Sequence, residues 1–154
     1  MDSLLSAMKA AAEPTRLRLL VLCAKADLTV SDLVRILGQS QPRLSRHLKL
    51  LAEAGLLDRT REGSWVFFRL AHKGQAAALA RNLVDSVPDD DPTVQRDLAG
   101  LEELMNERAR RAESYFRKVA KQWDQLRALY VHDDKVEQQL SELIAEEPVH
   151  DLLD

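Results

Sequence analysis

Cationic, amide and hydroxyl side chains cluster at one point of this sequence, where they would share one face of a helix. The segment 40–57 reads SQPRLSRHLKLLAEAGLL. Leu44, Leu48 and Leu51 follow the helical spacing i, i+4, i+7, so they predict a buried face and leave Arg46 on the opposite side. Arginine, glutamine and serine side chains on an exposed helix face can reach base edges and phosphates in a DNA major groove. An ordinary amphipathic surface helix is the alternative, and the flanking segments decide between the two.

The residues before this segment predict a second, shorter helix. Thr29 is a good N-cap, Asp32 follows at capping-box spacing, and Gly38 suits the position just after a helix end. Gln39 then leaves only a tight turn before Ser40, which is expected to cap the following helix. Two short helices joined by a tight, glycine-containing turn are the pattern of a helix-turn-helix.

The residues after this segment predict a basic β-hairpin. The stretches 56–60 and 65–70 have strand character around a turn at 62–64, and Arg59 and Arg61 flank that turn. A basic hairpin tip beside a DNA-reading helix would lie against phosphates or the minor groove, where it adds affinity more than sequence information. A hairpin whose arginines are simply solvated is the alternative.

With these elements in place, the first half of the chain resembles the DNA-binding domain of ArsR/SmtB-type bacterial repressors. The resemblance is carried by PTRLRLL at 14–20, SQPRLSRHLKLL at 40–51 and REGSWVFFRL at 61–70, with Glu13 where the family often has a stronger Asp N-cap. It implies a homodimer that sits on a palindromic operator in double-stranded DNA and blocks transcription until a signal releases it. The expected fold is mainly α: a winged helix-turn-helix with a two-stranded wing, plus a long C-terminal helical extension.

The resemblance also implies which residues touch DNA. Outward side chains of the second helix would contact bases or the backbone, and Lys49 and the wing arginines would hold phosphates, so affinity should fall steeply with salt. His47 matches the motif, but its place beside the buried face favours packing or hydrogen bonding at least as strongly as a phosphate contact. The expected DNA contacts are Ser40, Gln41, Arg43, Ser45, Arg46, His47, Lys49, Arg59 and Arg61.

Metal sensing, which many members of this family perform, is not expected here. Many of those sensors carry two cysteines where this chain has Thr29 and Ser31, and neutral hydroxyls are poor ligands for thiophilic metals. Cys23 lies within an apolar helix, where a buried small side chain is the expected role; a redox role would need a second thiol from another subunit. His72 has no neighbouring ligands in the sequence, so we expect no metal site.

Charge is unevenly divided along the 154 residues, whose net charge is −3. Residues 1–82 hold 13 Lys and Arg against 7 Asp and Glu, a balance of +6, whereas residues 83–154 hold 9 against 18, a balance of −9. This division is expected if only the first half touches nucleic acid; the acidic half is either a solvated surface or a competitor of DNA. A single cysteine favours the cytoplasm, and neither a signal peptide nor a membrane span is expected.

Residues 1–87 are expected to form the DNA-binding and dimerisation domain, followed by a proline-bounded linker at 88–92. By the family resemblance, the helix at 75–87 and the N-terminal helix build the dimer interface. Residues 93–131 then carry apolar side chains at spacings of three and four, which predict one long amphipathic helix, or two with a break near 109–113. The apolar stripe would pair with a second subunit as a coiled coil, or pack on a domain outside this chain.

The last residues, 132–154, are expected to hold a short helix and either a frayed apolar tail or the start of a truncated methyltransferase domain. YFRKVAKQWDQL at 115–126 and PVHDLLD at 148–154 resemble the leading helix and first strand of class I methyltransferases that use S-adenosylmethionine. The competing hypothesis is therefore the N-terminal portion of such an enzyme, or of a regulator that senses S-adenosylmethionine or S-adenosylhomocysteine. The glycine-rich cofactor loop of that fold is missing, so we expect neither enzymatic activity nor a cofactor site in this chain. A winged-helix interaction module without DNA is a third hypothesis.

Overall fold

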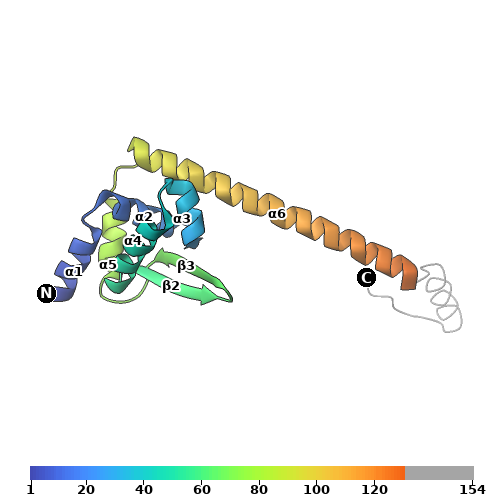
Figure 1. Ribbon diagram of the computed structural model, residues 1–154, viewed down its shortest axis with the longest axis horizontal. Helices are drawn as coiled ribbons and strands as arrows, with labels where there is room; N and C mark the ends of the chain where they lie inside the picture. Colours follow the sequence, from blue (N-terminus) through green and yellow to red (C-terminus); the bar gives the residue numbers. More distant parts are fainter. Residues whose placement is uncertain (131–154) are drawn as a thin grey trace, which may run out of the picture. The chain divides into compact units, whose positions relative to one another are not determined.

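The computed structural model describes residues 1–130, and the mainly helical winged helix-turn-helix predicted from the sequence is confirmed there (Figure 1). The predictions for 132–154, including the methyltransferase-like strand, lie outside the described residues. The chain divides into two units, Met1–Asn106 and Glu107–Asp154. In chain order the elements are α1 (Asp2–Ala11), α2 (Pro14–Lys25), β1 (Leu28–Thr29), α3 (Val30–Leu37), α4 (Gln41–Glu53), β2 (Leu57–Glu62), β3 (Trp65–Leu70), α5 (Ala77–Asp85) and α6 (Pro92–Tyr130).

The first helix of the helix-turn-helix, α3, begins and ends as its sequence predicts. The Thr29 hydroxyl accepts a hydrogen bond from the backbone N–H of Asp32 at 3.3 Å, and the Asp32 carboxylate accepts one from the backbone N–H of Thr29 at 2.7 Å. This reciprocal capping box satisfies two donors that a helix start leaves open. Gly38 follows the last turn with φ of 64°, a left-handed conformation that a side chain would disfavour, and so turns the chain toward α4.

The sheet has three strands in the order β1-β3-β2, so the prediction of two strands missed one. The missing strand, β1, pairs antiparallel with β3 through Leu28 opposite Phe68 and Thr29 opposite Phe67. Two residues are too few to produce a period-two pattern, which is why the sequence did not reveal this strand. The hairpin of β2 and β3 extends to Glu62 opposite Trp65, leaving a turn of two residues at its tip.

The core of the first unit is built mainly from leucine. Burial of the leucine side chains removes apolar surface from water, and each fully buried leucine contributes roughly 1.5–3 kcal/mol to the stability of the fold. The core leucines come from α2, β1, α3, α4 and the turn after α4. Helix α4 therefore contributes to the core as well as carrying the exposed polar residues of the segment 40–57. The fully buried large side chains are Leu19, Leu20, Leu22, Leu28, Leu33, Leu44, Leu48, Leu51 and Leu56.

The long helix expected after the linker is α6, one unbroken helix of 39 residues rather than two. Its first part packs in the first unit through Val94, Leu101 and Leu104, all buried. Met105 has the apolar spacing of this helix but is exposed in the single chain, whereas the neighbouring Leu104 is buried. Tertiary packing, rather than the apolar pattern alone, decides which face is buried.

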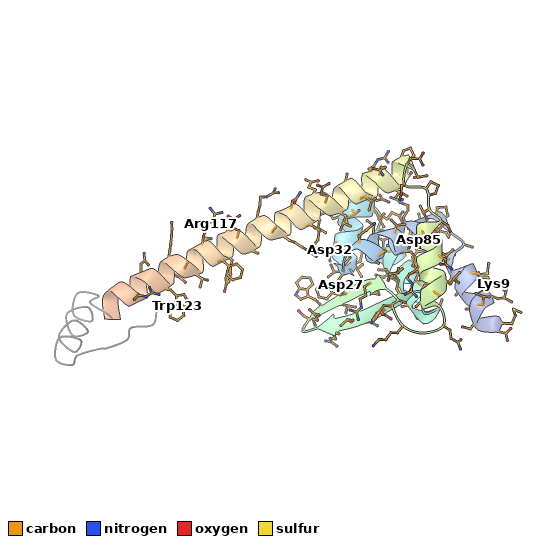
Figure 2. The ribbon with its side chains drawn as sticks, turned by 180° about the vertical axis from the view of Figure 1, so that it is seen from behind. Lys9, Asp27, Asp32, Asp85, Arg117 and Trp123 are labelled. Carbon is orange, nitrogen blue, oxygen red and sulfur yellow. The ribbon has the colours of Figure 1, made fainter. Side chains whose placement is uncertain are left out.

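The distal part of α6, in the second unit, carries exposed aromatic side chains. Tyr115, Phe116 and Trp123 are each exposed, and the rings of Tyr115 and Phe116 meet edge to face with centroids 6.1 Å apart. Figure 2 shows Arg117 and Trp123 projecting from different sides of this helix. The segment predicted to resemble a methyltransferase helix is therefore helical, while that resemblance itself stays a prediction. Among the described residues, no helix combines the length and the apolar character needed to cross a membrane.

Candidate nucleic-acid interface

Helix α4, hereafter the recognition helix, presents one buried and one exposed face. Leu44, Leu48 and Leu51 are fully buried against the core, as their spacing predicts. Ser45 and Arg46 lie on the exposed surface, and Arg46 makes no ion pair with any residue in the described part of the chain. A guanidinium that is not neutralised by a neighbour is available to a phosphate or to a guanine edge.

The recognition helix begins without a side-chain cap. Ser40 occupies the N-cap position, but its hydroxyl makes no capping hydrogen bond, so the expectation that it caps the helix was wrong. A capping hydroxyl bonds the N–H of the second or third helical residue. Pro42, the second, has no N–H, and the N–H of Arg43, the third, donates no hydrogen bond to the Ser40 hydroxyl. Ser40 and Gln41 are both exposed, which leaves their polar groups free to meet a ligand.

Glu13, the N-cap of α2, lies beside two side chains of the recognition helix. Its Oε2 accepts a hydrogen bond from the backbone N–H of Arg16 at 2.9 Å. The same oxygen lies 3.8 Å from Nδ1 of His47, and Oε1 lies 4.0 Å from Nη2 of Arg43. Glu13 therefore caps α2, as its position before the PTR motif predicts, and it also faces His47 and Arg43 of α4, which the sequence did not reveal.

His47 and Arg43 differ in how far this contact occupies them. The His47 side chain is only 14% exposed, and its buried Nδ1 has no hydrogen-bond partner within the described residues. This placement favours packing of His47 over a phosphate contact, the two roles that the sequence left open. Arg43 is 60% exposed, and its distance of 4.0 Å from Glu13 makes only a weak ion pair, so its guanidinium can still turn toward a ligand.

The environment of Glu13 changes its pKa. Burial by itself raises the pKa, but the hydrogen bond from the backbone N–H of Arg16 lowers it, with smaller contributions from Thr15 and His47. The net result is a pKa below the ordinary value of 4.5. The carboxylate therefore stays charged at neutral pH, where it can cap α2 and attract the guanidinium of Arg43.

The wing, the hairpin of β2 and β3, carries Arg61 close to its tip and Arg59 midway along β2. Arg59 is exposed, and Arg61 Nε donates a hydrogen bond to the carbonyl oxygen of Gly63 at 3.1 Å, which ties the guanidinium to the turn.

Trp65 stands beside this turn and is 58% exposed. We did not predict a role for Trp65, although its alternation with buried Phe68 in the strand could have revealed an outward-facing aromatic ring. The last arginine of the hairpin, Arg69, faces Asp58 at 3.9 Å and so belongs to the base of the wing.

Of the two positions considered above for metal ligation, Thr29 serves local structure. The Thr29 hydroxyl takes part in the capping box of α3, and Ser31 is exposed. Burial raises the pKa of the Cys23 thiol to about 12, so the thiolate is scarce at neutral pH. In the part of the chain that the structure describes, no group of three or more His, Cys, Asp or Glu side chains is arranged to hold a metal ion.

Comparison with known proteins places this geometry in one family. Residues 13–59 match the model of bacterial regulatory proteins of the arsR family. The chain is 47% identical over 64 residues to the arsenical resistance operon repressor of Escherichia coli, covering 41% of this chain and 55% of that protein. It is 32% identical over 62 residues to the transcriptional repressor SdpR of Bacillus subtilis, covering 40% of this chain and 69% of that protein.

A solved structure agrees with the fold. The transcriptional repressor BigR from Xylella fastidiosa superposes with a TM-score of 0.50 at 28% sequence identity, covering 56% of this chain and 84% of that one. The architecture and its exposed helix define a winged helix-turn-helix transcription regulator. The chain belongs to the arsR family of bacterial regulatory proteins. It spans about half the length of the first curated relatives that it matches.

Proposed function

We propose that this chain is a sequence-specific DNA-binding repressor of transcription that acts in the cytoplasm as a homodimer on a palindromic operator. The observation that carries the proposal is the recognition helix, whose leucine face is fully buried while its other face exposes Arg46, which forms no ion pair with any described residue. A helix held in this way can enter the major groove without unfolding the domain behind it.

In the proposed complex, the recognition helix and the wing contact different parts of the DNA. Outward side chains at the start of α4 contact base edges or nearby phosphates, because the N-terminal residues of such a helix approach the bases. Lys49 and the wing arginines hold phosphates, which fixes the protein on the duplex. The 3.8 Å distance between His47 and Glu13 supports a role for His47 in orienting α4, in addition to the proposed contact with DNA. The proposed contacts remain Ser40, Gln41, Arg43, Ser45, Arg46, His47, Lys49, Arg59 and Arg61.

An apolar surface on α1 supports the homodimer. Leu4, Leu5 and Met8 are each about half exposed, and they recur at helical spacing along this short helix. Three large apolar side chains together on a ten-residue helix exceed the isolated exposure that an ordinary surface shows. A second copy covering this face would place two recognition helices in successive major grooves, about 34–36 Å apart.

Selection from a library of random DNA duplexes tests the proposal directly. The purified chain is expected to enrich an inverted repeat whose half-sites lie about one helical turn apart, and light scattering is expected to give the mass of a dimer. Binding to the selected duplex should weaken steeply between about 50 and 200 mM salt. A library that stays unenriched at low salt would contradict DNA reading and favour a protein-interaction module. A monomeric mass for the wild-type chain would contradict the dimer. The variant Leu5→Glu, which places a charge on the apolar face of α1, is expected to be monomeric.

A further inference from the structure

A pocket of about 320 Å³ lies in the first unit, away from the exposed face of the recognition helix. Its apolar walls come from three segments: Pro14 and Leu17 of α2, Val87 and Pro88 of the connection after α5, and Val94 at the start of α6. This volume falls at the lower end of the range for small-molecule sites, about 300–1,000 Å³, and such sites are likewise lined mainly by apolar side chains.

The two charged side chains at this pocket already have hydrogen-bond partners within the protein. The Arg18 guanidinium holds Asp97 through two hydrogen bonds of 2.6 and 2.7 Å. The Asp91 carboxylate accepts hydrogen bonds from the backbone N–H groups of Thr93 and Val94, at 2.8 and 3.0 Å, at the positive end of α6. An anionic ligand would meet a guanidinium that Asp97 already neutralises, and a cationic ligand would meet a carboxylate that is already stabilised by the start of α6. Either ligand would also lose hydration on entry. The pocket fits a small, uncharged, apolar molecule.

The pocket also adjoins the segment that faces the recognition helix. Pro14, which lines the pocket, directly follows Glu13. The Glu13 carboxylate lies 3.8 Å from His47 and 4.0 Å from Arg43 of α4. A molecule that shifts the first turn of α2 would consequently shift the carboxylate against which two side chains of the recognition helix rest.

We propose that this pocket is an effector site that binds a small, uncharged, apolar molecule, and that its occupancy changes the affinity of the chain for DNA. The second part rests on the proposed DNA-binding function, whereas the first part stands on the pocket alone. Because coupling is reciprocal, a ligand that changes DNA affinity must itself be bound differently by the DNA complex.

Fluorine NMR of fluorobenzene with the whole chain tests the binding site. The fluorobenzene resonance is expected to broaden or shift with the wild-type protein and to stay unchanged with Val87→Trp, which fills the pocket. Val87→Phe is a smaller filling variant in case the tryptophan prevents folding, and Ala99→Trp, on the exposed surface of α6, is the matched control that should keep the effect. No change with the wild type, or an undiminished change with a folded filling variant, would overturn the proposed site.

Fluorescence anisotropy with the selected duplex tests the coupling. Saturating fluorobenzene is expected to change the dissociation constant of the wild type by about fivefold or more and to leave that of the filling variant unchanged. An unchanged dissociation constant in the wild type would overturn the coupling. A chain that binds no duplex would overturn the proposed function and the coupling with it, while the NMR result would still decide the pocket.

Discussion

Arg18 and Asp97 form a bidentate ion pair that joins α2 to the first part of α6. Nε and Nη2 of Arg18 donate to the two carboxylate oxygens of Asp97 at 2.6 and 2.7 Å. The Asp97 side chain is 3% exposed and that of Arg18 is 21% exposed. The hydrogen bonds to Asp97 raise the pKa of Arg18, because they stabilise the charged guanidinium. The start of α6 is thereby fixed to the winged helix by a specific pair as well as by apolar packing.

Removing one partner of this pair should destabilise the first unit. Asp97→Ala leaves a largely buried guanidinium without its carboxylate, and breaking a buried pair in this way costs about 3–5 kcal/mol. We expect the lower end of that range, because Arg18 retains some access to water. Urea denaturation followed by circular dichroism gives the free energy of unfolding. Asp90→Ala, in the exposed connection before α6, is the matched control, and equal unfolding free energies for the two variants would show that the pair contributes nothing.

Glu13 should make stability depend on pH in the acidic range. Its pKa is lowered in the folded protein, so its stabilising contribution is complete above the ordinary value of 4.5 and is lost as the pH falls through the lower, folded-state value. Glu13→Gln should therefore lower the melting temperature at about pH 7 and make progressively less difference toward about pH 3. Glu103→Gln, exposed on α6, is the control. A deficit of Glu13→Gln that persists undiminished at low pH would contradict this assignment.

Cys23 should resist thiol reagents in the native protein. The thiol is buried and its pKa is about 12, so both access and ionisation disfavour attack. Ellman's reagent is expected to modify the native chain slowly and the urea-unfolded chain fully within the dead time of mixing. Rapid stoichiometric modification of the native chain would contradict the burial of Cys23 and would favour a redox role for this thiol.

The wing arginines should contribute affinity without sequence preference. If Arg59 contacts a phosphate, Arg59→Ala should weaken binding to all duplexes by a similar factor and reduce the slope of log affinity against log salt by about one. A titration over several salt concentrations, with selected and unrelated duplexes, measures both quantities. A loss confined to the selected sequence would instead assign Arg59 to base reading.

Local sequence patterns predicted the elements that are determined by interactions between residues close together in the chain. The spacing of Leu44, Leu48 and Leu51 fixed the buried face of α4, and the pair Thr29 and Asp32 fixed the start of α3, because both depend on residues three or four apart. The exposed polar side of α4 followed from the same geometry. These elements made the candidate interface recognisable from the chain alone.

Contacts between distant residues could not be predicted in this way. Arg18 and Asp97 are 79 residues apart, and Glu13 meets His47 only because α2 and α4 pack together. No periodicity or motif records such pairings, since they arise from the tertiary arrangement. The same holds for Met105, which shares the apolar pattern of α6 but is exposed.

The affinity of Arg46→Ala for the selected duplex tests the central claim most directly. Arg46 is exposed and forms no side-chain hydrogen bond or ion pair with any described residue. Its removal should therefore leave folding intact while weakening specific binding by about 1–3 kcal/mol, roughly five- to 150-fold. Arg117→Ala, which removes an exposed arginine from the distal part of α6 (Figure 2), is the matched control and should bind as the wild type does. Anisotropy titrations of the three folded proteins decide the matter: a selective loss in Arg46→Ala is the predicted result, and unchanged affinity would contradict the reading of DNA by this helix.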